Sequence, residues 1–318
     1  MLLPFVLCVW MLSAAAAELP ETAPPSQAGK EGPPKASRIP AFDSTRAYRY
    51  LKELCALGPR NPGSEGHLRA LAYLGDHFRK LGLPVLVQNF VHADMSDGHK
   101  TEMSNIIVTV KGRDAKRKAA VFCAHWDTRP RAEQDPNPIF RDRPILGAND
   151  GASGAAVLME LAHLFKGRPP LQTLYLVLFD GEDYGPEGRL EEYFLGARHF
   201  ADNLPPKPIE YALLLDMVGD RDLRILQEPN SLAQSPALVR KIWSRAQSLG
   251  LKAFQASPGP TVFDDHVPLQ AKGIPAVDII DFEYPPWHTL GDTPDKCSAH
   301  SLGVVGRLMA SLAFQGLP

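Results

Sequence analysis

Short apolar runs alternate along this chain with longer segments whose apolar residues recur at helical spacing. The runs are rich in Val, Ile, Leu and Phe, and several are apolar throughout, which is typical of strands buried on both faces of a sheet. We therefore predict strands over residues 85–91, 105–110, 119–124, 174–179, 211–215 and 276–280.

The segments between these runs have the pattern of amphipathic or buried helices. In one of them, apolar residues at helical spacing predict a single buried face made of Leu68, Leu71, Leu74, Phe78 and Leu81. Because strands and helices alternate, the pattern predicts an α/β fold with a central, mostly parallel (mixed) sheet and helices on both faces. The predicted helices are residues 43–57, 67–81, 152–165, 238–249 and 301–314.

The N-terminal region differs from the rest of the chain. Residues 1–17 are apolar, carry no charged side chain and end in a run of alanines, which predicts a secretory signal peptide. An uncleaved anchor is the alternative. Residues 18–40 are rich in proline and poor in apolar residues, which predicts a flexible tether. We expect one folded domain over residues 41–318, exported to the periplasm or secreted, without stable membrane insertion.

Composition narrows the class of function. The formal net charge is −2, apolar residues make up 44% and charged residues 22%. These values are typical of a globular protein and argue against a nucleic-acid partner. No CxxC pair occurs, and Cys8 lies in the predicted signal peptide. We expect Cys55, Cys123 and Cys297 to be mostly buried free thiols with at most one disulfide, and we take a monomer as the default state.

Acidic and histidine side chains follow the predicted buried strands. Because the carboxyl ends of parallel strands meet at one edge of a sheet, these side chains should gather there. A cluster of like charges needs a cation or shared protons, and carboxylates with imidazoles suit Zn²⁺. The positions concerned are His125, Asp150, Asp180, Glu182, Asp183, Asp216, Asp264, Asp265, His266 and His288.

Each of these residues alone has an ordinary structural explanation. Asp150 could cap the helix that follows it, Asp180 could belong to a turn, and His125 could be a core histidine. A metal site is favoured because acidic or histidine residues follow several of the predicted strands at once. Other chemistries fit less well, because GASGA at residues 151–155 lacks the last glycine of GxSxG, and no P-loop, GxGxxG or HExxH motif occurs.

Several motifs together resemble zinc peptidase family M28. They are AHWDT (124–128), GANDGASGAAVLMELA (147–162), FDGEDYG (179–185), LLLDMVGD (213–220) and the segment from DDHVPLQAKGIPAVDII to WHTLGDTPDK (264–296). The likeness runs through nearly all of residues 43–314. It implies a zinc exopeptidase-like fold and one of two activities: a di-zinc aminopeptidase, or a one-zinc glutaminyl-peptide cyclotransferase that converts N-terminal Gln to pyroglutamate.

The resemblance also implies site residues. The family's ligand positions match residues here, with Asp183 in place of a glutamate, and Glu182 matches its general acid/base. Every ligand position is still able to bind metal, so the ligands alone leave both activities open. A non-catalytic binding domain of the same fold is a third possibility, which the intact ligand set disfavours. The matching ligand positions are His125, Asp150, Asp183, Asp216 and His288.

Three features resemble the cyclase branch, and the last of them resembles bacterial enzymes of that branch. They are the Trp287-His288 pair, the Asp264-Asp265-His266 trio and the GEDYG sequence that contains Asp183. The chain departs from the animal cyclases because residues 184–194 contain no tryptophan. Another aromatic residue must complete the substrate pocket beside Trp287, and the candidates are Trp126, Tyr184, Tyr193 and Phe282.

On the cyclase interpretation, the partners are peptides or proteins with N-terminal Gln. Asp150, Asp183 and His288 would hold one zinc ion, and His125 would lie beside it instead of binding it. Glu182 would move the proton between amine and ammonia, assisted by Asp216 and Asp264. On the aminopeptidase interpretation, His125 and Asp216 would complete a second zinc site bridged by Asp150.

Overall fold

The computed structural model describes residues 39–318, so the predicted signal peptide and nearly all of the predicted tether lie outside the described residues. Residues Ile39–Pro318 form one unit. It is an α/β domain built on a mixed sheet with the strand order β1-β2-β4-β3-β5-β8. The fold class that the sequence predicts is therefore confirmed.

The strands of this sheet match the predicted apolar runs. They are β1 (Val85–Ala93), β2 (Lys100–Val110), β3 (Ala119–His125), β4 (Leu174–Phe179), β5 (Ile209–Asp216) and β8 (Ala276–Ile280). The neighbours β4, β3, β5 and β8 run parallel, whereas β1 pairs with β2 and β2 pairs with β4 in antiparallel fashion. The parallel half therefore carries its carboxyl ends at one edge.

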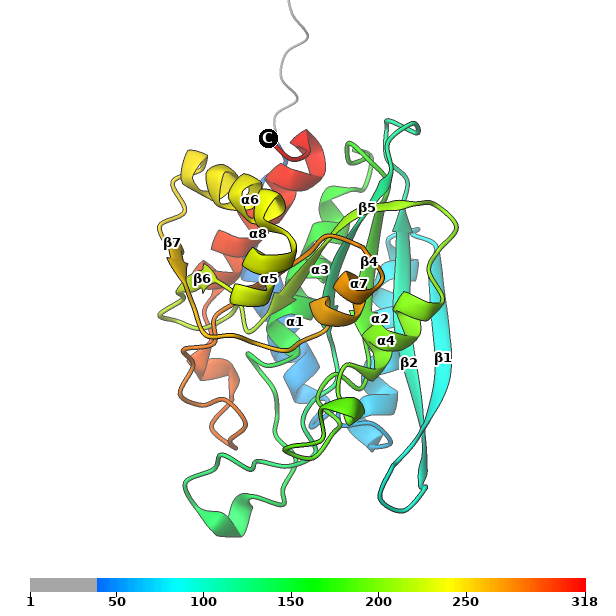
Figure 1. Ribbon diagram of the computed structural model, residues 1–318, viewed down its shortest axis with the longest axis vertical. Helices are drawn as coiled ribbons and strands as arrows, with labels where there is room; N and C mark the ends of the chain where they lie inside the picture. The colour runs from blue at the N-terminus through cyan, green and yellow to red at the C-terminus, as the bar shows by residue number, and fades with distance from the viewer. Residues whose placement is uncertain (1–38) are drawn as a thin grey trace, which may run out of the picture. The chain divides into compact units, whose positions relative to one another are not determined.

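Helices cover both faces of the sheet. One face packs under α1 (Ser44–Ala56), α2 (Glu65–Lys80), α3 (Ala152–Leu164), α6 (Pro236–Ser248) and α8 (Ala299–Gln315). The other face packs under α4 (Leu195–Asp202) and α7 (His266–Ala271), which lie in front of the sheet in Figure 1. The short elements are β6 (Ile225–Gln227), α5 (Pro229–Gln234), β7 (Phe254–Pro258) and the 3-10 turns Pro138–Phe140, Leu190–Glu192 and Pro294–Lys296.

Strand alternation assigns side chains to the two faces. Along β3, Phe122 joins the larger cluster beneath α3, while Val121 and Cys123 join the cluster beneath α4 and α7. Helix α3 approaches β5 closely because Gly154 has no side chain: a Cβ there would lie 2.1 Å from the carbonyl oxygen of Leu215. This contact brings the start of α3 next to the end of β5.

One prediction about the helices is wrong. Of the face predicted for the second helix, Leu74 and Phe78 are buried and Leu71 and Leu81 pack against the core, but Leu68 is 62% exposed. His67 and Ala70 are buried as well. The helix begins at Glu65, where the Ser64 hydroxyl accepts from the backbone N–H of His67 at 3.1 Å. The buried face therefore keeps most of the predicted residues and excludes Leu68. The sequence pattern did not predict α4, α5, α7, β6 or β7.

The cysteines agree with expectation. Cys55, Cys123 and Cys297 are buried free thiols, so no disulfide forms among the cysteines that the structure describes. Within residues 39–318, no helix is both long enough and apolar enough to cross a membrane.

Candidate metal centre and its cavity

The parallel strands deliver their polar residues to one edge of the sheet, as predicted. His125 is the last residue of β3, Asp216 is the last residue of β5, and Glu182 and Asp183 follow the end of β4. All four side chains are buried or nearly so. The acidic cluster therefore forms because β4, β3 and β5 are neighbours in the sheet and end at the same edge.

Asp150 comes from the loop before α3, and that loop has a constrained backbone. Gly151 adopts a positive φ of 95°, and a Cβ there would lie 2.4 Å from the carbonyl oxygen of Asp127. The buried carboxylate of Asp292 accepts from the backbone N–H of Asn149 at 2.8 Å and of Asp150 at 3.2 Å. These contacts hold Asp150 in place. Sequence reasoning had not singled out Asp292.

Asp150, Asp183 and His288 form a set of three buried ligand atoms within 4.8 Å of one another. His288 Nε2 lies 3.6 Å from Asp150 Oδ2 and 3.4 Å from Asp183 Oδ2. Neither of these oxygens has a hydrogen-bond partner in the part of the chain that the structure describes. Two unpartnered buried carboxylate oxygens and one imidazole fit a divalent cation, and the donor set suits zinc.

His288 also has an unusual backbone, with a φ of 53°. Non-glycine residues at positive φ are uncommon, and they concentrate at functional sites. The fold thus holds the backbone of His288 in an unfavourable conformation, and the imidazole faces the two carboxylates.

A second group of three shares Asp150. His125 Nε2 lies 3.1 Å from Asp150 Oδ1 and 3.1 Å from Asp216 Oδ1. Burial alone would lower the pKa of His125, but the carboxylates around the ring raise it well above its ordinary value. Asp150 therefore directs one oxygen to each group. This arrangement matches the bridging position that the resemblance implies.

Asp127 and Arg129 also shape the centre, and sequence reasoning assigned no role to either. The carboxylate of Asp127 accepts from the backbone N–H of Glu182 at 3.2 Å and of Asp183 at 3.3 Å. The guanidinium of Arg129 donates to Asp183 Oδ1. Asp127 stands inside the AHWDT motif, so a signal existed for it. Nothing in the sequence pattern indicated Arg129, because only the folded chain brings it to Asp183.

Glu182 lies beside the ligands and faces the cavity. Its Oε2 atom is 3.8 Å from His125 Nδ1. Burial and the nearby charge of Asp183 raise the pKa of Glu182 well above its usual range. A carboxyl group that holds its proton more tightly is suited to exchange a proton with an amine. The predicted general acid/base is therefore placed next to the candidate metal ligands.

Further acids lie near Glu182. Asp264 is buried, and burial together with the charges of Asp216 and Asp265 raises the pKa of Asp264. Burial also raises the pKa of Asp265 and Asp278. Among residues 39–318, Oδ2 of Asp264 and both carboxyl oxygens of Asp265 and Asp278 have no hydrogen-bond partner. This cluster holds protons more tightly than free aspartates do. Asp278 is an addition to the acidic residues predicted from the sequence.

A cavity of about 180 Å³ opens above these groups. Trp287 forms part of its wall, and the indole stacks on the imidazole of His288 with ring centroids 3.7 Å apart. The ring of Phe282 lies next to the indole of Trp287, with ring centroids 5.1 Å apart, and also lines the cavity. Tyr193 and Phe194 contribute further aromatic surface. Trp287 and Phe282 are thus placed where a pocket wall requires them.

Trp126 does not line this cavity. It is fully buried, and its indole N–H donates to the carbonyl oxygen of Ser104 at 3.2 Å. Its ring stacks on the imidazole of His67 with centroids 4.6 Å apart. The expectation that Trp126 lines the substrate pocket is therefore corrected: directly after β3, its side chain turns into the core, away from the cavity.

Comparisons with known proteins were consistent with these features. A sequence profile of peptidase family M28 matches residues 105–313. The solved structure of Fimbriiglobus ruber glutaminyl cyclase is 38% identical, with a TM-score of 0.79 over 86% of this chain and 95% of that one. Drosophila melanogaster glutaminyl-peptide cyclotransferase is 28% identical over 79% of this chain and 76% of its own length. Bacillus subtilis aminopeptidase YwaD is 27% identical over 67% of this chain and 44% of its length.

Proposed function

The chain belongs to peptidase family M28, and within this family we propose that it is a glutaminyl-peptide cyclotransferase. The reaction joins the α-amine of an N-terminal Gln to its own side-chain carbonyl carbon. The bond from that carbon to the amide nitrogen breaks, and ammonia leaves with the proton taken from the amine. The products are a pyroglutamyl peptide and ammonia.

One observation carries this proposal. A single cavity of about 180 Å³ brings together Glu182, the three-ligand group and a Trp287 wall. A small cavity with an aromatic wall suits the side chain of an N-terminal Gln, which it can enclose together with the amide group that reacts. The likeness to the Fimbriiglobus ruber cyclase, at 38% identity over most of both chains, supports the same assignment.

Each residue has a role in this proposal. Asp150, Asp183 and His288 hold a zinc ion, which when bound polarises the side-chain carbonyl of the substrate Gln. Glu182 accepts the proton of the attacking amine and delivers it to the departing nitrogen. Asp264 lines the same cavity as Glu182 and supplies a second carboxyl group for that proton.

Other residues position the substrate and shield the reaction. Trp287 and Phe282 enclose the substrate side chain and exclude water. Asp216 orients the amine from the end of β5. His125 stands between Asp150 and Asp216 and holds both carboxylates in place. The substrates are peptides or proteins with N-terminal Gln.

A di-zinc aminopeptidase is the second candidate. His125 Nε2 lies 3.1 Å from both Asp150 and Asp216, so these residues would serve as a second ligand group bridged by Asp150. Glu182 would then act on a water molecule that attacks a peptide carbonyl. The likeness to the Bacillus subtilis aminopeptidase supports this alternative, over a smaller share of that protein's length.

Two dipeptides separate the candidates. The full chain is purified with zinc and incubated with Gln-Ala and with Leu-Ala, and ammonia and free leucine are measured. Ammonia from Gln-Ala without leucine from Leu-Ala is the result expected of the cyclase, whereas released leucine would favour the aminopeptidase. Glu182→Gln should remove either activity while zinc stays bound. A variant as active as the parent would contradict both mechanisms.

The proposal extends to the location of the enzyme. Residues 1–17 act as a cleavable secretion signal, and the mature chain is released as a monomer. Expression of the full chain in a bacterial host, followed by N-terminal sequencing of the periplasmic protein, tests this. A new N-terminus near Ala17 is expected. An intact N-terminus in the membrane fraction would indicate an uncleaved anchor instead.

A further inference from the structure

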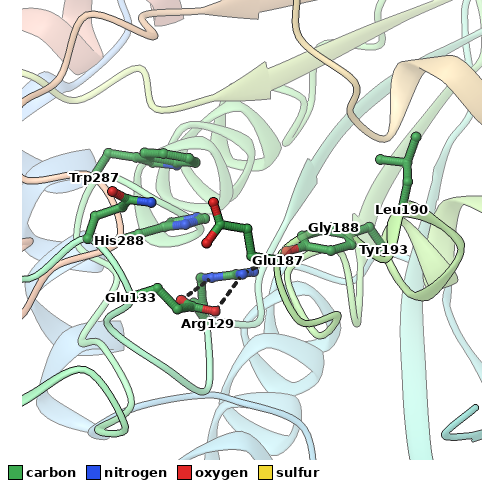
Figure 2. A pocket seen from close by; sticks show the side chains of 9 residues that line it. Arg129, Glu133, Glu187, Gly188, Leu190, Tyr193, Trp287 and His288 are labelled. Carbon is green, nitrogen blue, oxygen red and sulfur yellow. Dashed lines mark hydrogen bonds and ion pairs between the residues drawn. The ribbon is translucent and has the colours of Figure 1, made fainter. Parts of the chain in front are cut away.

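A second cavity, of about 290 Å³, adjoins the first one. The two cavities share Leu190, Tyr193, Trp287 and His288 as wall residues. Figure 2 shows the rings of Trp287 and His288 on one side of the second cavity and Tyr193 with Leu190 on the other. A peptide whose first side chain occupies the inner cavity therefore has a second recess directly beside it.

The charged side chains around Arg129 in this second cavity are already paired with one another. The guanidinium of Arg129 donates to Glu133 at 2.7 and 2.8 Å, to Asp183 at 2.6 Å and to the Tyr193 hydroxyl at 2.6 Å. Glu133 is also bound by Arg131 at 3.2 Å. These groups satisfy one another, so they offer little net charge to a ligand.

Glu187 differs from these residues. Its side chain is exposed, and Figure 2 shows its carboxylate pointing into the cavity between Arg129 and the rings of Trp287 and His288. It has no hydrogen bond or ion pair with any other residue that the structure describes. The nearest cation in sequence, Arg189, pairs with Glu192 at 3.6 Å. An unpaired negative charge thus faces an otherwise charge-balanced recess.

We propose that this second cavity binds the residue that follows the N-terminal Gln, and that Glu187 makes a lysine or arginine preferred at that position. The inference rests on the proposed cyclase function. With the Gln side chain in the inner cavity, the next residue passes the shared wall of Trp287 and His288. The aliphatic stem of a lysine packs against Leu190 and Tyr193, and its ammonium group reaches Glu187.

The test compares three peptide amides that differ only at the second residue: Gln-Lys, Gln-norleucine and Gln-Glu. At low ionic strength, kcat/KM for the lysine peptide should exceed that of the norleucine peptide by about 1.5- to 5-fold, the range of a single exposed ion pair. The glutamate peptide should be the poorest. The advantage of lysine should shrink at high salt, because exposed charges are screened.

Variants test whether the lysine preference depends on Glu187. Glu187→Gln should equalise the lysine and norleucine peptides, and Glu187→Lys should favour the glutamate peptide instead. Glu191→Gln is the matched control, because Glu191 is exposed in the 3-10 turn that follows but lines neither cavity. It should keep the preference of the parent enzyme.

The outcomes separate this proposal from the proposed function. Cyclisation of all three peptides at equal efficiency, or a lysine preference that survives Glu187→Gln, would overturn the subsite assignment and leave the cyclase intact. A preference for norleucine over lysine would overturn it as well. Failure to cyclise any of the three would refute the cyclase function, and the subsite would fall with it.

Discussion

Arg129 donates from Nη1 to Oδ1 of Asp183 at 2.6 Å, and both side chains are buried. The other oxygen of the same carboxylate, Oδ2, faces His288 Nε2 at 3.4 Å. Arg129 therefore determines which oxygen of Asp183 is left for a metal. Burial raises the pKa of Asp183, but the charges of His288 and Arg129 outweigh it and hold that pKa below its usual value.

Removing this guanidinium should weaken metal binding. We expect Arg129→Met to raise the Kd for zinc by about 10- to 100-fold, because an outer partner that orients a ligand has effects of that size. Competition with a chromophoric chelator measures the affinity. Arg131→Met is the control, since Arg131 contacts Glu133 and backbone carbonyls but not Asp183. Equal loss in both variants would show that Arg129 has no specific effect.

The number of bound ions distinguishes the two ligand groups. If the chain is a cyclase, elemental analysis after dialysis should give one zinc per chain. His288→Ala should abolish binding, and His125→Asn should retain one ion, because only the first substitution removes a proposed ligand. Two ions in the parent protein and one in His125→Asn would support the aminopeptidase instead.

Glu228 should contribute acid-sensitive stability. Its buried carboxylate accepts from the backbone N–H groups of Asn230 at 2.8 Å and Ser231 at 2.5 Å, and His266 lies 3.3 Å away. Burial raises the pKa of Glu228, but these partners outweigh burial and bring the pKa to about 2. The carboxyl group of Glu228 therefore binds a proton more weakly in the folded state than in the unfolded chain. Its contribution to the free energy of unfolding is complete above about pH 4.5 and disappears toward pH 2.

Glu228→Gln should therefore lower the free energy of unfolding by about 2–3 kcal/mol at pH 7. The difference from the parent protein should shrink as the pH falls from about 4.5 to 2. Urea unfolding at several pH values measures it. Glu102→Gln, on an exposed strand position, should show no such difference. A gap that stays constant down to pH 2 would rule out Glu228 as its source.

The two tryptophans near the centre should behave in opposite ways. Trp126→Phe removes the hydrogen bond to Ser104 and should cost about 1–3 kcal/mol of stability with little effect on KM. Trp287→Ala removes a cavity wall and should lower kcat/KM on the order of tenfold with little effect on unfolding. Thermal unfolding and steady-state kinetics on both variants provide the comparison. A large rise in KM for Trp126→Phe would contradict its placement in the core.

The buried strands were predictable because their apolar runs have few structural alternatives. The strand ends followed from these runs, and they in turn predicted that His125, Asp183 and Asp216 gather at one edge of the sheet. Side-chain direction was harder to predict. Leu68 fits helical spacing, yet the face that a helix buries depends on how it packs on the sheet. Trp126 and Arg129 show the same limit: the contacts with Ser104 and Asp183 join residues far apart in the sequence.

The three proposed ligands arrive on three separate stretches of chain: Asp150 before α3, Asp183 after β4 and His288 after β8. During synthesis, the two carboxylates emerge more than a hundred residues ahead of the imidazole. The metal site is therefore finished only when β8 has paired with β5 and the following loop has closed. Zinc retained by the protein would report that the last third of the chain has folded, and a chain truncated before His288 should be unable to retain it.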